Sequence, residues 1–142
     1  MVVLVVNLVA TVLVEVDVRI LICGSRFFQD FLLFEEKVDE VFKKFNKSSI
    51  EIISGGARGT DSLVEMYAKM HKLPNRIVKA KWLVHGKSAG PLRNSKMVEI
   101  ADVCIAFLAN GKDNKGTNDT LTKARIKGIP CEVFFVDVED FT

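Results

Sequence analysis

Short apolar runs alternate with longer amphipathic runs along most of this chain, and this alternation constrains the fold more than any other feature. The amphipathic runs repeat their apolar residues at helical spacing, as Phe34, Val38 and Phe42 do within a helix predicted over 30–45. The pattern predicts a doubly wound, Rossmann-like α/β fold with three layers and a mostly parallel sheet. The predicted strands are 19–23, 50–54, 76–80, 102–108 and 131–136.

Three further helices are predicted. The first covers 60–71 and turns Leu63, Tyr67 and Met70 inward. The second begins at Pro91, whose missing N–H costs nothing at a first helical position. The third follows the polar loop 109–119 and ends at Gly128, and segment 81–90 is expected to be irregular.

The first 18 residues lie outside this alternation of strands and helices. They are very apolar, but Asn7, Glu15 and Asp17 interrupt them, so they are too polar for a membrane span and lack the basic start of a secretory signal. Their alternating valines favour an extra β-strand or hairpin on a sheet edge or at an oligomer contact. We therefore expect a β extension over 1–18, a single domain over 19–142, and a homo-oligomer.

Charge and cysteine content narrow the class of protein. The net charge of +2 does not indicate a nucleic-acid binder, but 69–96 holds eight Lys or Arg residues and no acidic residue. That stretch is either a solvated basic face or one wall of an anion site. Three cysteines without zinc spacing read as reduced core thiols of a cytoplasmic protein, and no metal, cofactor or membrane partner is expected.

Glycine and basic residues gather where the predicted strands end. In a parallel sheet these carboxyl ends share one edge, where ligands bind. Glycines let backbone N–H groups approach an anion, helix N-termini favour phosphate, and arginine adds a bidentate donor. The candidate ligand-binding residues are Gly24, Ser25, Arg26, Gly55, Gly56, Ala57, Arg58, Gly59, Thr60, Asp61, Arg93, Asn94, Gly116 and Thr117.

Several of these residues also have a structural interpretation. Asp61 is more often a helix cap than a catalytic group, and Thr60 and Thr117 fit N-caps equally well. Ser25 suits a turn cap, and Arg26 an ion pair with Asp30. Trp82 reads as a core anchor in preference to a base-stacking surface.

The motifs GSR (24–26), GGARGTD (55–61), HGKSAGPLRNSKM (85–97) and GT (116–117) together resemble the YspA-type branch of the SLOG superfamily. The resemblance covers 19–136 and implies a Rossmann-like fold that binds nucleotides or nucleotide-derived ligands. Relatives of the "lonely guy" type are phosphoribohydrolases that remove the base from a nucleoside 5′-monophosphate, and they commonly dimerise. The DNA-processing protein A shares the superfamily fold.

The phosphoribohydrolase signatures are only partly present. The first signature is a helix start of the form Arg-Lys-x-x-Met, of which Arg93 and Met97 are present. The second is a PGGxGTxxE loop that ends in the catalytic glutamate. Thr120 stands at the position of that glutamate, with Asp119 one residue earlier. A one-residue shift on a helix turns a side chain by about 100°. The candidates for a catalytic role are therefore Asp119, Asp61 and Arg93.

Three hypotheses follow. The first, which we favour, is a protein that binds or senses a nucleotide or nucleotide-derived phosphate ligand, which needs no catalytic carboxylate. The second is an N-glycosidic hydrolase acting on nucleoside monophosphates, whose oxocarbenium-like transition state a carboxylate stabilises. The third is a single-stranded DNA-binding protein, supported by the basic stretch 69–96 but weakened by its few aromatic residues.

Overall fold

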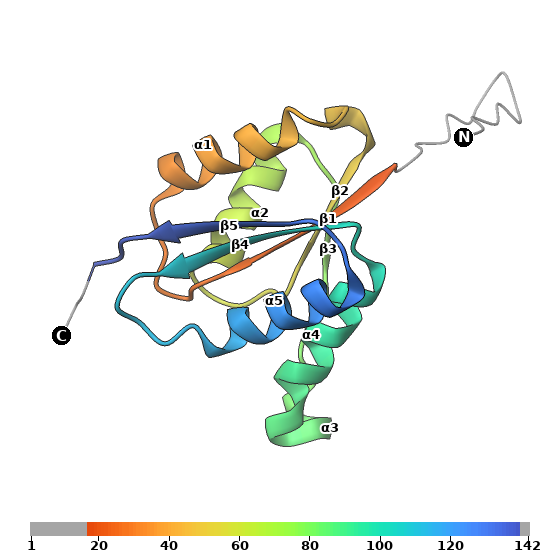
Figure 1. The fold of residues 1–142 in the computed structure, drawn as a ribbon, viewed down its shortest axis with the longest axis vertical. Coiled ribbons are helices and arrows are strands. Elements are labelled where there is room, and N and C mark those ends of the chain that lie inside the picture. The colour runs from red at the N-terminus through yellow and green to blue at the C-terminus, as the bar shows by residue number, and fades with distance from the viewer. Residues whose placement is uncertain (1–16, 140–142) are drawn as a thin grey trace, which may run out of the picture.

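A computed structural model describes residues 17–139, which form one five-stranded, fully parallel sheet flanked by helices (Figure 1). The strand order is β3-β2-β1-β4-β5, so the direction of winding reverses between β1 and β4. This confirms the predicted doubly wound fold. The strands are β1 (Val18–Gly24), β2 (Ile50–Ser54), β3 (Asn75–Ile77), β4 (Val103–Ala109) and β5 (Cys131–Val136).

The helices cover both faces of the sheet, which gives the three predicted layers. Helices α1 and α2 lie on one face, and α4 and α5 lie on the other (Figure 1). The short helix α3 continues the α4 layer and projects from the body of the domain. The helices are α1 (Phe31–Phe42), α2 (Thr60–His71), α3 (Trp82–His85), α4 (Ala89–Ile100) and α5 (Lys115–Lys127), with 3-10 turns η1 (Lys47–Ser49) and η2 (Gly86–Ser88).

Aromatic residues build the core under α1 and α2. The rings of Phe28 and Phe34 each lie 5.2 Å from the Phe107 ring, between centroids. Tyr67 is fully buried as predicted, and its hydroxyl donates to the Asp39 carboxylate at 2.6 Å. Ring contacts of this kind stabilise a core beyond the area that they bury. They anchor the loop after β1, because Phe28 belongs to it.

The core under α4 and α5 uses smaller side chains. Leu21, Cys104 and Ala106 of the sheet are fully buried there against Met97 and Leu121 of the helices. Cys23 and Cys104 are the buried free thiols that the sequence predicted, whereas Cys131 on the edge strand is only partly buried. These side chains pack α4 and α5 against the sheet.

Some element boundaries differ from the prediction. Helix α1 ends at Phe42, before the predicted Phe45, because η1 follows it, capped by Asn46, whose side chain accepts from Ser48 N at 3.2 Å. Strand β3 covers only Asn75–Ile77, since the chain after it leaves the sheet toward α3.

The helix starts also move. Helix α4 begins at Ala89, so Pro91 is its third residue; its missing N–H still lies in the first turn, where the helix makes no bond to it. Helix α5 begins at Lys115, inside the predicted loop. On α2, Met70 is 62% exposed although its spacing predicted an inward side chain, because the last turn passes the end of the core.

The predicted β extension falls almost wholly in residues 1–16, which lie outside the described part of the chain. Within 17–139, no helix has the length and apolar character needed to cross a membrane. The same residues contain no cluster of three or more His, Cys, Asp or Glu side chains arranged to hold a metal ion.

Candidate functional site

A cavity of about 500 Å³ lies at the carboxyl edge of the sheet, at the point where the strand order reverses. In open α/β sheets, ligands bind in the crevice at such a switch point. We call it the switch-point cavity. Its lining residues come from the loops after β1, β2 and β4 and from α2, α4 and α5: 23–27, Gly55, Ala57, Asp61, Arg93, Asn94, Met97, 112–117 and Thr120.

The charged lining of the switch-point cavity is mainly basic. Four cationic and two acidic side chains reach it, which suits an anionic ligand better than a cationic one. The cations come from two loops and two helices, so they approach the space from different parts of the fold. They are Arg26, Arg93, Lys112 and Lys115, and the acids are Asp61 and Asp113.

The first turn of α5 forms one wall of the cavity. Lys115, Gly116 and Thr117 all line it, and a Cβ added to Gly116 would meet no other atom within 4 Å. The turn is fixed by Asn114, whose side chain accepts from Ala109 N at 2.9 Å and donates to Ala109 O at 3.0 Å. A helix N-terminus presents unpaired N–H groups and a partial positive charge, both of which attract phosphate.

The loop after β1 is held rigidly against the start of α2. Ser25 O accepts from both Thr60 N, at 3.1 Å, and Thr60 Oγ1, at 2.8 Å. Ser25 Oγ accepts from Phe27 N at 3.1 Å, which confirms the predicted turn cap. Thr60 therefore ties two loops together and does not line the cavity.

Two cations of the cavity rest on one aromatic ring. The Arg26 guanidinium lies 4.9 Å from the centroid of the Phe27 ring, and Lys112 Nζ lies 5.1 Å from it. Asp30, the expected partner of Arg26, instead caps α1 by accepting from Leu33 N at 3.1 Å. Arg26 is thus held by a cation–π contact beside the cavity.

Two glycines of the loop after β2 are required by contacts within the protein. Gly59 has φ +67°, and a Cβ on it would lie 2.3 Å from the backbone C and O of Arg26. Gly56 has φ +70°, and its added Cβ would meet Ile77 at 2.8 Å. These two residues and Arg58 do not line the cavity, although the sequence suggested them for ligand contact.

Gly55 instead makes room for Arg93. A Cβ on Gly55 would lie 2.5 Å from Arg93 Nη1, and that nitrogen donates to Gly55 O at 2.8 Å. Arg93 Nε donates to Asn94 Oδ1 at 2.9 Å. The guanidinium is thereby fixed in the cavity wall between α4 and the loop after β2.

Asp61 is the buried acid of the cavity. It is 9% exposed, and its Oδ2 accepts from Ala57 N at 2.9 Å. Burial raises the pKa of Asp61 above its ordinary value of 3.8, although bonds from the Ala57 and Gly55 backbone and the charge of Arg93 oppose the shift. Its carboxylate closes the loop before α2, whereas the helix cap itself is Gly59, which has no side chain.

Asp119 lies outside the cavity lining. Its Oδ2 accepts from Lys123 Nζ at 2.9 Å and from Asn94 Nδ2 at 3.0 Å. Burial alone would raise its pKa, but these two bonds outweigh it and the pKa of Asp119 is lowered. Thr120, the next residue along α5, does line the cavity, as the 100° rotation between neighbouring helix positions requires.

Some lining residues were not among the candidates, and some candidates lie elsewhere. Lys112 and Lys115 line the cavity without belonging to any motif; their position after β4, at the switch point, is the signal that identifies them. Thr117, a possible N-cap, is the third residue of α5. Trp82 is 59% exposed on α3, so its prediction as a core anchor was wrong.

A parallel 3-2-1-4-5 sheet with a basic cavity at its switch point defines a Rossmann-like α/β domain. The chain belongs to the YspA, cpYpsA-related SLOG family, whose model matches residues 18–85. Gene 61 protein of Mycobacterium phage D29 is 34% identical to it over 119 residues, covering 79% of this chain and 92% of that protein.

One solved structure resembles the fold. It is DNA processing protein A from Streptococcus pneumoniae, with a TM-score of 0.49 and 16% sequence identity. The match covers 80% of this chain and 57% of that one, so this chain spans little more than half of its length.

Proposed function

We propose that this protein binds a nucleotide or a nucleotide-derived phosphate ligand in the switch-point cavity. The observation that carries the proposal is the convergence of four cations and the first turn of α5 on one cavity. A phosphate group at Gly116 and Thr117 meets the helix N-terminus, with Lys115 and Arg26 as cationic neighbours. Membership of the SLOG family supports the same class of ligand.

The rest of the cavity suits the uncharged part of such a ligand. Met97 and Phe27 supply apolar surface, and Asn94 and Asp61 supply polar groups. A volume of about 500 Å³ lies within the usual range for small-molecule sites. Binding of this kind requires no catalytic carboxylate, so the protein would act as a sensor or carrier of its ligand.

A thermal-unfolding screen tests the proposal. The probes are nucleoside mono- and diphosphates, ADP-ribose, the parent nucleosides and inorganic phosphate. A ligand at 100 times its dissociation constant stabilises the fold by about 2.7 kcal/mol, a shift of several degrees. Arg26→Ala should abolish the shift, whereas Lys69→Ala, which removes an exposed cation of α2 outside the cavity, should retain it.

The outcome that overturns the proposal is equally clear. If no phosphate-bearing probe raises the unfolding temperature, or if nucleosides stabilise the protein as well as their phosphates do, the cavity is not a phosphate site. If Arg26→Ala and Lys69→Ala reduce the thermal shift equally, the shift depends on the overall charge of the protein and not on the cavity. That result also contradicts the proposal.

A second candidate is N-glycosidic hydrolysis of the bound nucleotide, and one observation favours it. Asp61 is a buried carboxyl that lines the cavity beside Arg93, and its pKa is raised by burial. Perturbed carboxyls in clefts are typical of catalytic groups. In this reaction water adds at the sugar carbon as the bond to the base breaks, and the base leaves with a proton.

Release of free base from nucleoside monophosphates tests this second candidate. Asp61→Asn should then abolish release while preserving the thermal shift, and Asp119→Asn should leave release intact because Asp119 lies outside the cavity lining. If the wild-type protein releases no base from any ligand that stabilises it, the reaction is excluded and binding remains.

A further inference from the structure

Helix α3 carries three consecutive apolar side chains into solvent. Trp82 is 59% exposed, Leu83 is fully exposed and Val84 is 72% exposed. The helix projects beyond α4 at the bottom of Figure 1. Contiguous exposed apolar surface of this kind marks an interaction site in a folded protein.

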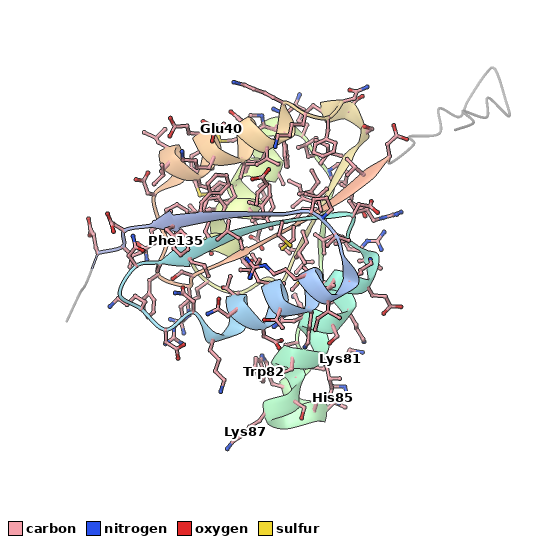
Figure 2. The ribbon with its side chains drawn as sticks, viewed as in Figure 1. Glu40, Lys81, Trp82, His85, Lys87 and Phe135 are labelled. Atoms are coloured by element: carbon pink, nitrogen blue, oxygen red, sulfur yellow. The ribbon has the colours of Figure 1, made fainter. Side chains whose placement is uncertain are left out.

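The surroundings of these side chains are uniformly basic. Lys79, Lys81 and Lys87 are exposed beside them, and Figure 2 shows Lys81, Trp82, His85 and Lys87 together on the projecting element. The sequence has no acidic residue between Glu65 and Glu99. We call residues 79–87 the basic knob; it requires a partner surface with an apolar centre and an acidic rim.

The same chain offers such a surface elsewhere. A second cavity of about 550 Å³ lies between the loop after β1 and the segment after β5. Three apolar and three acidic residues line it together with one glutamine. They are Phe27, Phe28, Val138, Asp30, Asp137, Glu139 and Gln29.

The knob and the second cavity are separate surfaces, because the knob follows β3 at one edge of the sheet and the cavity is lined by the segment after β5 at the other edge. The knob continues the layer of α4 and α5, whereas Asp30, in the wall of the second cavity, caps α1 in the other layer. A copy of the protein therefore presents both surfaces at once, facing different directions. Contact between them joins two different patches, which is a head-to-tail arrangement.

We infer that the basic knob of one copy docks into the acidic second cavity of another copy. Trp82, Leu83 and Val84 bury their exposed apolar surface against Phe27 and Val138, and the lysines of the rim face Asp137 and Glu139. An apolar centre with a charged rim is the usual anatomy of a protein interface. This inference goes beyond the nucleotide site, with which the second cavity shares only Phe27.

Charge favours docking of the knob into the second cavity over packing of two knobs against each other. Two knobs would bring like-charged lysines together, which is unfavourable, whereas three acidic residues line the second cavity against two cations, Arg26 and Lys112, that lie on the Phe27 ring. A head-to-tail contact repeats until the assembly closes into a ring or extends.

Two variants of the full-length protein separate the two surfaces. Leu83→Asp disables the knob at a fully exposed position, and the double variant Gln29→Arg with Glu139→Arg neutralises the net negative charge of the residues that line the cavity, also at exposed positions. Circular dichroism confirms that each variant is folded. Ile126→Asp, at an apolar position of α5 that is 81% exposed, is the matched control.

Sedimentation over a range of concentrations gives the readout. The wild type and Ile126→Asp should associate, and each knob or cavity variant alone should stay monomeric. A mixture of the two variants should form a one-to-one complex of twice the monomer mass and nothing larger, because it holds one intact knob and one intact cavity. Fluorescence of Trp82, the single tryptophan of the chain, should shift to the blue in that complex.

Three results would overturn the inference. The wild type could remain monomeric at every concentration. Association could persist in Leu83→Asp, which would assign it to another surface such as the N-terminal segment. The mixed variants could fail to pair; a Trp82 signal seen only with single-stranded DNA or anionic vesicles would then identify the partner of the knob instead.

Discussion

Arg93 lies directly against Gly55, and its Nη1 donates a hydrogen bond to the Gly55 carbonyl oxygen at 2.8 Å. A Cβ atom added to Gly55 would lie only 2.5 Å from the same nitrogen. One cation of the switch-point cavity is thus positioned by the absence of a side chain on the neighbouring loop. Gly55, the first residue after β2, makes room for an arginine of α4 that lies 38 residues further along the chain.

Gly55→Ala should weaken ligand binding more than it weakens the fold. The new methyl displaces a flexible guanidinium, so the unfolding temperature should fall only slightly, by about 1 kcal/mol of stability or less. A nucleotide held partly by Arg93 should lose about tenfold in affinity, equivalent to 1.4 kcal/mol. Titration calorimetry beside a thermal melt separates the two effects; an unchanged affinity would show that Arg93 does not hold the ligand.

Gly59→Ala should instead damage the fold itself. Its φ is +67°, and its Cβ would lie 2.3 Å from the Arg26 backbone, which cannot move aside as a side chain can. We expect a loss of about 2–4 kcal/mol in the free energy of unfolding. Urea denaturation measures it.

Gly116→Ala is the matched control for Gly59→Ala. An added Cβ there meets nothing within 4 Å, and the residue lies in the first turn of α5. Alanine is the better helix former, so the substitution should be neutral or stabilise by about 0.5 kcal/mol. Equal losses in both variants would contradict the close packing of the loops after β1 and β2.

The raised pKa of Asp61 makes the stability of the fold depend on pH. Because burial raises its pKa above 3.8, the folded protein binds its proton more tightly than the unfolded chain does. Stability from this group is therefore present below pH 3.8 and is lost as the pH rises through the raised value. Asp61→Asn removes this dependence, so the unfolding temperature of the variant should rise relative to that of the wild type as the pH increases from 3.8 through the raised pKa of Asp61.

The contribution of Asp119 to stability should change with pH in the opposite direction. Although burial opposes it, hydrogen bonds from Lys123 and Asn94 lower the pKa of Asp119 below 3.8. Its contribution to stability is present above that value and is lost as the pH falls through the lowered pKa. Asp119→Asn should therefore be less stable than the wild type at pH 7 and converge with it in acid. Parallel melting curves at all pH values would contradict both carboxyl assignments.

The sequence was sufficient for the architecture but not for the roles of individual glycines. Strand and helix periods alone predicted the doubly wound sheet, and Tyr67 and Leu63 were placed inward correctly. Gly55 and Gly59 carry no local mark of whether a ligand or another loop approaches them. Only the tertiary fold brings Arg93 and Arg26 to those positions.

The errors at the site have similar physical causes. Trp82 was expected to be a core anchor whose indole N–H finds a partner, but a four-residue helix that projects from the domain has no core to bury it in. Lys112 and Lys115 lacked a motif, and their importance comes from the place of β4 beside β1 in the sheet. Thr117 lines the cavity as the candidate list predicted, and only its alternative interpretation as an N-cap was wrong, because α5 already begins at Lys115.

The most direct test of the central proposal is to locate the bound ligand on the protein. Backbone amide signals are followed by NMR during titration with the nucleoside phosphate that gives the largest thermal shift. We expect the largest changes at the start of α5, in Gly116 and Thr117, and in the loop around Arg26, and we expect inorganic phosphate to perturb the same amides. Changes confined to the basic knob, or none at those amides at saturation, would contradict a phosphate site in the switch-point cavity.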